Sequence, residues 1–503
     1  MSEAVECYQQ ALSLAPDNAI VLNNLANALR DQCKYDAAIQ CYQQSLALNP
    51  GNSLGYNSLG NLLRDLGHPD LAVEQYRKAL AINPDLEYVH SNLLYTLLNI
   101  PDYNPDDIFA EHLQFARQFE APHRPFWPKH DNSRDKDRRL KIGYVSGDFY
   151  NHSIAFFILP VLAGHDKSQV EVFCYYNHDK QDEITNRLMA LSDHWIPCKS
   201  LSHEELVARI RNDRIDILVD LSGHTGRHRL LTFARKPAPL QITWMGYPNT
   251  TGLAAMDYRL TDAAVDPVGM TERFNSETLL RLPAACQFNP VAQRPPVNAL
   301  PALSRNVFTF ACLNSLAKIT EQAIARWAQI LHAVPQARLM LGNVNNELSR
   351  NKLAQAFARH DIAEERLVMH PNMVMGDFLA LHHQIDLALD PFPFNGGTTT
   401  FHAISMGVPT ITLAGNSPVT RSGASIMANV GLPEFVTFTE EEYVQRAIEF
   451  ASDLPRLERI RQSLRNGNSA LYEPGKNHFA GYVEQAFRQI WTAWCSSHAG
   501  SAA

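Results

Sequence analysis

The chain has 503 residues, of which 45% are hydrophobic and 19% charged, and its formal net charge is −8. That length exceeds what one hydrophobic core normally serves, so we expect two to four domains. The acidic balance argues against a polyanion-binding protein, because neutralising phosphates requires an excess of Lys and Arg. The sequence shows neither an apolar run of about 18 residues nor a signal-peptide pattern, and its eight cysteines are scattered. We therefore expect a cytoplasmic protein with reduced thiols.

The first hundred residues contain an internal repeat of 34 residues. The segments AVECYQQALSLAPDN, AIQCYQQSLALNPGN and AVEQYRKALAINPDL align at 4–18, 38–52 and 72–86. This period, with a proline after the second helix of each pair, is typical of tetratricopeptide repeats, which bind extended peptides on a concave face. We expect a repeat domain over residues 1–120.

Two asparagines in the repeats are candidate peptide contacts. Asn24 and Asn92 lie two repeats apart on the first helix of each pair. Their amides are suited to hydrogen-bonding the backbone of a bound peptide. The alternative is that both are ordinary solvated residues of a helix surface.

Beyond the repeats, the pattern changes to strands alternating with helices. Residues 121–139 are rich in proline and then in charge, which indicates a linker. The alternation over residues 140–290 and again over 291–490 predicts two doubly wound lobes, each with a parallel sheet covered on both faces. Residues 491–503 are expected to form a flexible tail. Ligands of such lobes bind at the carboxyl ends of the strands, so we expect a site where the lobes meet.

The segment DPFPFNGGTTTFHAISMG carries the strongest candidate for a ligand site. After an apolar strand, Asn395, Gly396 and Gly397 lead into Thr398, Thr399 and Thr400 at the start of a helix. Backbone N–H groups and hydroxyls at a helix N-terminus can converge on an anion, and a diphosphate is the natural ligand. The alternative is an ordinary tight turn with a Thr N-cap.

A cation is expected near this segment. The chain lacks G-x-G-x-x-G and the P-loop pattern, and its only D-x-D, at residues 135–137, lies in the linker. A metal-dependent glycosyltransferase is therefore disfavoured, and protein groups would have to stabilise a departing diphosphate. Lys318 in CLNSLAKIT is suited to this role, and the alternative is a surface lysine.

The first lobe contributes its own candidates. His152, at the turn after the first strand, is placed to accept a hydroxyl proton, and the alternative is a structural turn histidine. His194 has a weaker case, because beside Trp195 it could simply be packed. We also expect residues 249–251 to line the cleft. Further candidate cleft-lining residues are Gly246, Tyr247, Pro248 and Arg421.

The motifs resemble those of the protein O-GlcNAc transferase/SPINDLY family. The resemblance covers nearly the whole chain and is carried by IGYVSGDFYNHS, ILVDLSGHT, PAPLQITWMGYPNTTGLAAMDYRLTD, LNSLAKIT, LALDPFPFNGGTTT and MGVPTITLAG. The residues of these motifs are more similar to those of the SPINDLY branch and its bacterial relatives than to those of animal O-GlcNAc transferases. The resemblance implies repeats followed by a two-lobed GT-B region of two Rossmann-like domains, and a metal-independent, inverting enzyme that glycosylates Ser or Thr of proteins selected by the repeats.

The same resemblance assigns residues. His152 falls on the family's active-site histidine and Lys318 on its diphosphate-binding lysine. Asn314 is a further expected donor-binding residue. Thr398 and Thr399 fall on phosphate-contacting threonines. Phe378 falls near the position that packs on the nucleotide base. UDP-GlcNAc is the expected donor, and GDP-fucose is the alternative.

Three positions depart from the family pattern. Gly397 stands where O-GlcNAc transferases have a histidine, His402 stands where the family has Asp or Glu against the ribose, and Ser315 replaces Asn or Gln. A neutral His402 is expected to accept one ribose hydrogen bond, lost below about pH 6.5. The departures leave open a repeat-bearing adaptor whose transferase module has decayed. A transferase for small molecules or glycans is disfavoured, since the repeats would then have no role.

Overall fold

The computed structural model describes residues 2–101, 103–291, 293–465 and 478–497. Its contacts divide the chain into two compact units that each gather distant segments of sequence. The first unit comprises the described residues of 1–103, 293–413 and 437–465. The second comprises those of 104–292, 414–436 and 466–503. Among the described residues, no helix is both long and apolar enough to cross a membrane.

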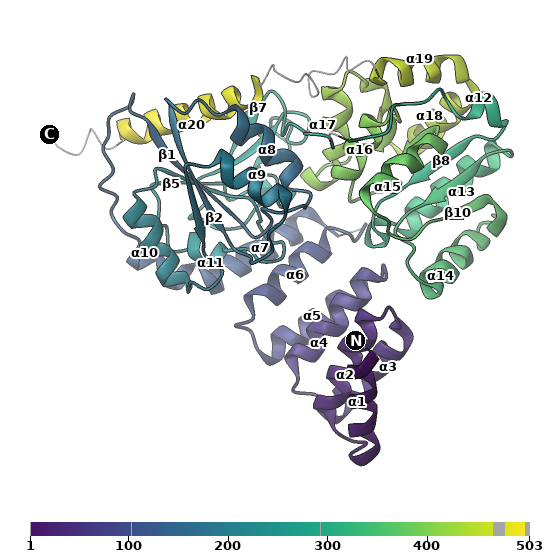
Figure 1. The fold of residues 1–503 in the computed structure, drawn as a ribbon, viewed down its shortest axis with the longest axis horizontal. Coiled ribbons are helices and arrows are strands. Elements are labelled where there is room, and N and C mark those ends of the chain that lie inside the picture. The colour runs from purple at the N-terminus through teal and green to yellow at the C-terminus, as the bar shows by residue number, and fades with distance from the viewer. Residues whose placement is uncertain (1, 102, 292, 466–477, 498–503) are drawn as a thin grey trace. The chain divides into compact units, whose positions relative to one another are not determined.

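The first unit begins with six helices that form the predicted repeats (Figure 1). They are α1 (Ser2–Leu14), α2 (Ala19–Asp31), α3 (Tyr35–Leu48), α4 (Ser53–Asp65), α5 (Pro69–Ile82) and α6 (Glu87–Leu97). Equivalent bonds recur along the array: the Tyr42 hydroxyl donates to Asn27 Oδ1 at 2.7 Å, and Tyr76 to Asn61 at 2.9 Å. Both tyrosines are fully buried. The 34-residue repeat of the sequence therefore corresponds to a repeat of the same packing contacts.

Helix α7 (Pro105–Phe119) corrects the predicted end of the repeat domain. Although it lies within residues 1–120, it belongs to the second unit. His112 Nε2 lies 3.0 Å from the Tyr247 hydroxyl, and the buried Phe115 ring meets the His224 ring edge-on at 4.7 Å. The predicted boundary at residue 120 is wrong, because the apolar face of α7 is buried in the second unit.

The rest of the first unit is one of the two predicted lobes. Its six-stranded sheet has the order β10-β9-β8-β11-β12-β13, and the pairs β10–β9, β9–β8, β8–β11 and β11–β12 are parallel. The strands are β8 (Thr309–Cys312), β9 (Arg338–Leu341), β10 (Leu367–Met369), β11 (Leu387–Leu389), β12 (Thr410–Leu413) and β13 (Val436–Thr437). The helices are α12 (Ala302–Arg305), α13 (Glu321–Ala333), α14 (Glu347–Ala358), α15 (Met375–Leu381), α16 (Thr398–Ser405), α18 (Glu440–Ser452) and α19 (Leu454–Arg465).

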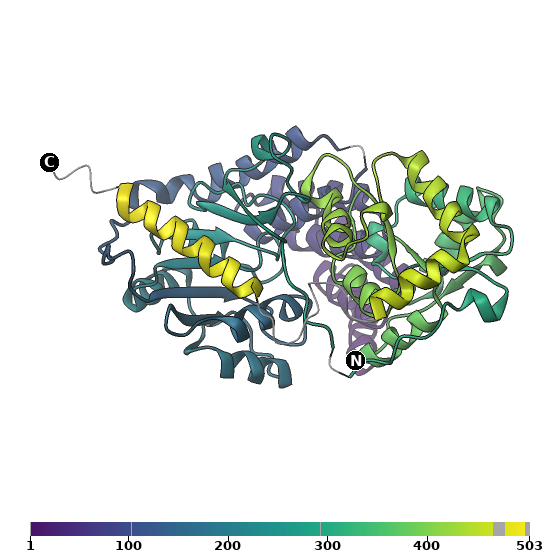
Figure 2. The same cartoon turned by 90° about the horizontal axis from the view of Figure 1, so that it is seen from above.

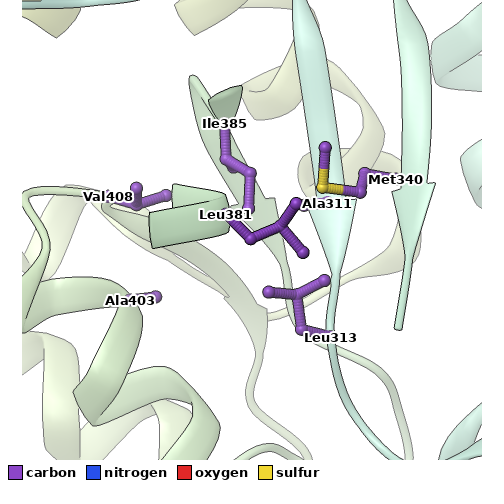
Figure 3. Packing of buried hydrophobic residues seen from close by; sticks show 7 residues of the cluster. All are labelled: Ala311, Leu313, Met340, Leu381, Ile385, Ala403 and Val408. Carbon is purple, nitrogen blue, oxygen red and sulfur yellow. The ribbon is translucent and has the colours of Figure 1, made fainter. Parts of the chain in front are cut away.

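A compact apolar cluster fixes helices α15 and α16 against this sheet. Figure 3 shows Ala311 of β8 and Met340 of β9 beside Leu381 of α15, with Ala403 of α16 in the same cluster. All four are buried. Apolar strand faces are expected in a parallel sheet that is covered on both sides. Because Ala403 belongs to this cluster, α16 is packed against the sheet.

The second unit contains the other predicted lobe. Its seven strands have the order β3-β2-β1-β4-β5-β6-β7, with parallel neighbours throughout. They are β1 (Leu140–Ser146), β2 (Val170–Tyr176), β3 (His194–Pro197), β4 (Ile217–Asp220), β5 (Leu240–Thr243), β6 (Tyr258–Asp262) and β7 (Thr278–Leu282). The helices besides α7 are α8 (Ala155–Gly164), α9 (Glu183–Leu191), α10 (His203–Asp213), α11 (Leu230–Phe233), α17 (Ser422–Asn429) and α20 (His478–Ser497). Repeats followed by two parallel-sheet, Rossmann-like domains confirm the predicted fold class.

The C-terminal helix was placed wrongly by sequence reasoning. Helix α20, yellow in Figure 2, packs on α8, β5 and β7 of the second unit rather than ending the second lobe at residue 490. The predicted tail also starts too early, because Trp491 is fully buried and α20 continues to Ser497. Residues 498–503 of that tail lie outside the described residues. Arg488 donates to the Arg138 carbonyl at 2.9 Å, so the helix holds the predicted linker against the sheet.

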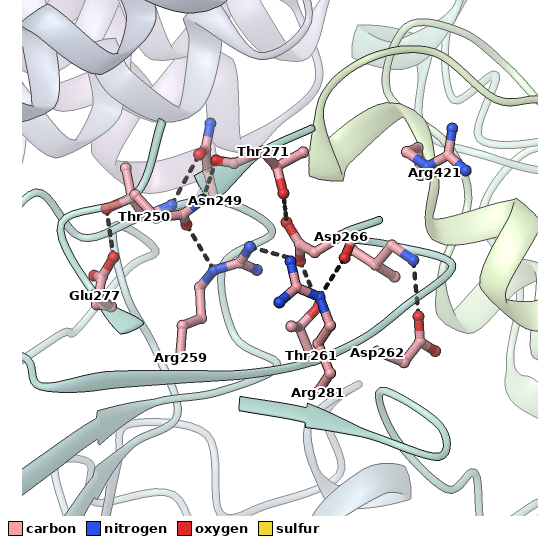
Figure 4. A network of polar contacts seen from close by, with 12 residues as sticks. Asn249, Thr250, Arg259, Thr261, Asp262, Asp266, Thr271, Glu277, Arg281 and Arg421 are labelled. Atoms are coloured by element: carbon pink, nitrogen blue, oxygen red, sulfur yellow. Dashed lines mark hydrogen bonds and ion pairs between the residues drawn. The ribbon is translucent and has the colours of Figure 1, made fainter. Parts of the chain in front are cut away.

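A buried polar network explains why residues 414–436 also join the second unit. Ser425 of α17 donates to the Asp262 carboxylate at the end of β6, and Arg421 Nε donates to the Ala264 carbonyl at 2.7 Å. Beside them, Arg259 and Thr271 both donate to the Asp266 carboxylate at 2.6 Å (Figure 4). These bonds satisfy buried charges within the unit, so this segment is fixed to it.

Candidate functional site

The strongest candidate site lies at the carboxyl end of β11. The strand ends at Leu389, and the carboxylate of the next residue, Asp390, accepts hydrogen bonds from the Gly396 amide at 2.7 Å and from the Thr412 hydroxyl at 2.8 Å. A Cβ at Gly396 would lie 2.5 Å from Thr400 Oγ1 and 2.9 Å from Asp390 Oδ1. Only glycine fits there, because these atoms approach its Cα closely. Asp390 thus shapes the loop that leads into α16.

Gly397 has a different environment. It precedes Thr398, the first residue of α16, and a Cβ built on it meets no heavy atom within 4 Å. The space above the helix start is therefore open, and the first-turn amides of Thr398, Thr399 and Thr400 form an N-terminus suited to an anion.

Lys318 reaches the same loop from another element. It ends the short helix η3 (Leu316–Lys318) after β8, and Nζ donates to the Asn395 carbonyl at 2.8 Å. The same Nζ lies 3.9 Å from the centre of the Phe394 ring, a close cation–π contact. The structure thus brings together Lys318 and the segment from Asn395 to Thr400, as the sequence predicted.

Burial sets the electrostatics of this pair of charges. Burial lowers the pKa of Lys318 to about 8, although nearby Asp390 acts to raise it. Burial likewise raises the pKa of Asp390 to about 7, against the bonds from Gly396 and Thr412 and the charge of Lys318. Near neutral pH, Lys318 carries its positive charge beside a helix N-terminus, which gives the site an excess of positive potential for an anion.

Two predicted donor-binding asparagines support the backbone. Asn395 is 1% exposed, and its side chain donates to the Pro391 carbonyl at 3.1 Å. Asn314 is buried, and its carbonyl accepts a bond from Asn343 Nδ2 at 3.0 Å. Direct donor contact by either side chain stays a prediction.

A small cavity of about 20 Å³ lies inside the sheet–helix layer beneath this loop. It holds about one water molecule. Its lining includes Asn314, Asp390, Thr399, Thr400, Ala403 and Thr410.

His402 departs from the role expected of it. It is 3% exposed, and the half-buried ring of Phe378 meets it nearly perpendicularly at 5.7 Å. Burial lowers the pKa of His402 to about 4. The prediction that this ring titrates near pH 6.5 is wrong, because an apolar setting disfavours its charged form. The placement of Phe378 on a base stays a prediction.

His152 lies in the second unit, after β1. Its side chain is 38% exposed, with Nδ1 3.7 Å from Asp148 Oδ2, and its ring lies 5.5 Å from that of Tyr150. Burial lowers the pKa of His152, and Asp148 raises it, so the ring is neutral at pH 7. Nδ1 also accepts a hydrogen bond from the Ile154 amide at 3.4 Å. Asp148 was not identified from the sequence, although an Asp four residues before the histidine was a usable signal.

Other predicted residues of the second unit have structural contacts. His194 begins the edge strand β3, paired with mid-strand Phe173, and its Nε2 lies 2.7 Å from Glu171. Its placement in a cleft is therefore wrong, since it lies away from the carboxyl ends of the strands. Thr250 and Thr251 are fully buried and donate to Glu277, so residues 249–251 serve the internal network.

The remaining candidates divide similarly. Tyr247 is buried and bonded to His112, and Arg421 is buried and donates to the carbonyls of Ala264 and Gly415, so both have structural contacts within the unit. Their place along a cleft stays a prediction. Gly246 and Pro248 are half-buried, and their role stays a prediction.

In the repeats, Asn24 and Asn92 are both half-buried. The Asn92 amide donates to Asn57 Oδ1 at 3.0 Å, a partner from the preceding repeat that sequence reasoning missed. A role for either asparagine in peptide binding stays a prediction. Among the described residues, no group of three or more His, Cys, Asp or Glu is arranged to hold a metal ion.

Comparison with known proteins agrees with this architecture. Residues 1–51 and 17–85 match the tetratricopeptide repeat family, and residues 88–288 and 298–476 match glycosyl transferase family 41. The SPINDLY protein of Solanum lycopersicum, named a probable UDP-N-acetylglucosamine–peptide N-acetylglucosaminyltransferase, is 36% identical over 80% of this chain and 44% of its own length. The SPINDLY protein of Arabidopsis thaliana, with the same name, is 36% identical over 82% of this chain and 46% of its own.

A solved structure extends the match to nearly the full chain. A mutant of the Thermobaculum terrenum O-GlcNAc transferase, in which one lysine is replaced by methionine, superposes with a TM-score of 0.90 and 36% identity, covering 98% of this chain and 94% of that one. The chain spans just under half the length of the plant relatives. These matches confirm the resemblance drawn from the motifs, and the chain belongs to glycosyl transferase family 41, in the group of the O-GlcNAc transferases and SPINDLY proteins.

Proposed function

We propose that this protein transfers N-acetylglucosamine from UDP-GlcNAc to Ser or Thr hydroxyls of proteins. The observation that carries the proposal is the placement of Lys318 over the Phe394 ring and against the Asn395 carbonyl, beside the open start of α16. This arrangement suits the diphosphate of a nucleotide-sugar. The names of the plant relatives and of the Thermobaculum structure support the choice of donor and acceptor.

The chemistry is a direct displacement at the anomeric carbon. The acceptor oxygen forms the new bond as the bond to the β-phosphate oxygen breaks, so the configuration inverts and the electron pair leaves on the diphosphate. Lys318 and the amides of Thr398 and Thr399 stabilise that growing negative charge without a metal ion. His152 takes the hydroxyl proton.

The repeats bind the acceptor protein. Their concave face would hold an extended segment of a protein substrate, with Asn24 and Asn92 as backbone contacts. Binding of the acceptor at the repeats and of the donor at α16 accounts for a chain with both modules.

The test is mass spectrometry of a peptide and protein pool incubated with the full chain and either UDP-GlcNAc or GDP-fucose. We expect a gain of one N-acetylhexosamine with UDP-GlcNAc, abolished in Lys318→Ala. Modification only with GDP-fucose would reassign the donor. If neither donor is used and calorimetry detects no binding of UDP or GDP, the protein is a repeat-bearing adaptor instead.

A further inference from the structure

Lys318 depends on two supports within the first unit. One is the backbone of η3, which carries it, and the other is the ring of Phe394, over which its ammonium lies at 3.9 Å. Phe394 is 7% exposed and belongs to the loop between β11 and α16. A shift of either support moves the ammonium relative to the helix start.

The repeats contact both supports. The Tyr95 ring of α6 lies 5.8 Å from the Phe394 ring, within the range of a stabilising aromatic pair. At the end of α4, a Cβ on Gly67 would lie 3.0 Å from the Leu316 carbonyl, so the turn is pressed against η3. Lys352 of α14 holds that turn by donating to the Leu66 carbonyl at 2.9 Å and to the Gly67 carbonyl at 2.7 Å.

The charge of Lys352 suits this place. The turn closes α4 by a Schellman pattern, in which Gly67 N–H donates to Arg64 and His68 N–H to Leu63. Carbonyls at a helix C-terminus attract a cation. Lys352 therefore joins the α4 terminus to the lobe that contains η3.

The repeats also depart from their own pattern at these contacts. Positions 27, 61 and 95 are Asn, Asn and Tyr. The two asparagines accept bonds from Tyr42 and Tyr76 of the next helix, whereas the corresponding position 110 is Ala. At the helix-ending positions, Cys33 has φ of +58°, and Gly67 has φ of +74°. The two repeats that make these contacts thus differ from the pattern, one by a missing side chain at Gly67 and the next by a large ring at Tyr95.

We propose that Tyr95 and Lys352 are positioning residues through which the repeats hold Lys318 in place for the departing diphosphate. This inference rests on the proposed function. The repeats are then part of the support of the donor site as well as an acceptor surface. A chain without the repeats would lose the support of the donor site and the acceptor surface together. Point variants are therefore needed to separate these two roles.

The test compares full-length Tyr95→Ala, Tyr95→Phe and Lys352→Met with Tyr88→Ala, a control at an exposed tyrosine of the same helix. Hydrogen exchange of the ligand-free protein is followed in peptides covering 314–320 and 392–400. We expect exchange of 392–400 in Tyr95→Ala, and of 314–320 in Lys352→Met, to rise about 2- to 10-fold, the effect of losing one aromatic or charged contact. Tyr95→Phe keeps the ring and should stay within about twofold of the wild type.

A second readout is turnover of UDP-GlcNAc with a short peptide acceptor. Tyr95→Ala should lower kcat more than it raises KM, because Lys318 acts on charge that develops in the transition state. Unchanged exchange at 392–400 in Tyr95→Ala, or an equal change in Tyr88→Ala, overturns the inference. If the variants show the expected rises in hydrogen exchange but the wild-type protein binds no UDP, the proposed function is contradicted. The contact between the repeats and the Lys318 supports is then still established.

Discussion

The Lys318 ammonium lies 3.9 Å from the centre of the Phe394 ring and 2.8 Å from the Asn395 carbonyl oxygen. An aromatic face and a carbonyl stabilise a cation but supply no formal charge. The carboxylate that acts on Lys318 is Asp390, which is itself bonded to Gly396 and Thr412. The lysine is therefore held in place while its positive charge remains available for a ligand.

Because burial lowers the pKa of Lys318 to about 8, the activity should depend on pH. Below about pH 8 the ammonium is charged and stabilises the leaving diphosphate. As the pH rises through about 8 the amine becomes neutral, so kcat/KM for the donor should fall. Lys318→Arg should lack this alkaline decline, because a guanidinium does not titrate there. Lys318→Ala should lose about 10²- to 10³-fold in rate at neutral pH. A wild-type profile that stays flat up to pH 10 would contradict the assignment.

Asp390→Asn tests the coupling between the two buried charges. Asparagine keeps the size of the side chain and an acceptor for Gly396, but removes the anion that raises the pKa of Lys318. The alkaline decline of kcat/KM should therefore move to lower pH.

Asp386→Asn is the matched control. Asp386 lies at the other end of β11, accepts two backbone amides at 2.8 Å, and has a pKa raised to about 6 by burial. Both variants should lower the melting temperature, but only Asp390→Asn should shift the pH profile. An equal shift in the two variants would show that lost stability, rather than lost charge, is the cause.

Periodicity predicted most elements of the fold because the relevant signals are local. The 34-residue repeat, the buried strands and the glycines before Thr398 are each visible within a short window. Which sheet a helix covers is a long-range property, and here the alternation of strands and helices misled. Helix α20 follows the second lobe in sequence but packs on the first, through buried Trp491 and the bond from Arg488 to Arg138.

The same distinction applies to the candidate site. Lys318 and the threonines could be predicted because each follows a strand of one sheet, and such strand ends converge. The burial of His402 and the bonding of Tyr247 to His112 depend on residues far away in sequence, and neither has a local signature. The contact between Tyr95 and Phe394 joins residues about 300 positions apart. Its one local trace is a tyrosine where the repeat elsewhere has asparagine.

His402 should not control the pH dependence of nucleotide binding. Burial lowers its pKa to about 4, so the ring is neutral at both pH 6 and pH 8. The ratio of UDP affinities between wild type and His402→Gln, measured by calorimetry, should thus be the same at the two pH values. His402→Glu should destabilise the fold, because it buries a carboxylate beside Phe378. A ratio that changes more than about threefold would show that His402 titrates in this range.

His152 and Lys318 lie in different units, so their roles can be separated. His152→Ala should lower transfer about 10²- to 10⁴-fold, the usual contribution of a general base. Its UDP affinity should stay within about twofold of wild type, because Lys318 and the start of α16 remain intact. Loss of turnover and of UDP binding in parallel would instead indicate a structural histidine.

The pH dependence gives an independent check on His152. Its pKa is lowered by burial, with Arg227 and Lys180 lowering it further and Asp148 raising it. A base is inactive when protonated, so kcat/KM should fall only as the pH drops below the usual histidine value of 6.5. Asp148→Asn removes the group that raises the pKa of His152, and the acidic decline should move to still lower pH.

The control is His194→Ala. His194 lies on the exposed edge strand and is bonded to Glu171, so this variant should leave both the rate and its pH profile unchanged. An acidic decline that stays in place in Asp148→Asn would assign that titration to a group other than His152.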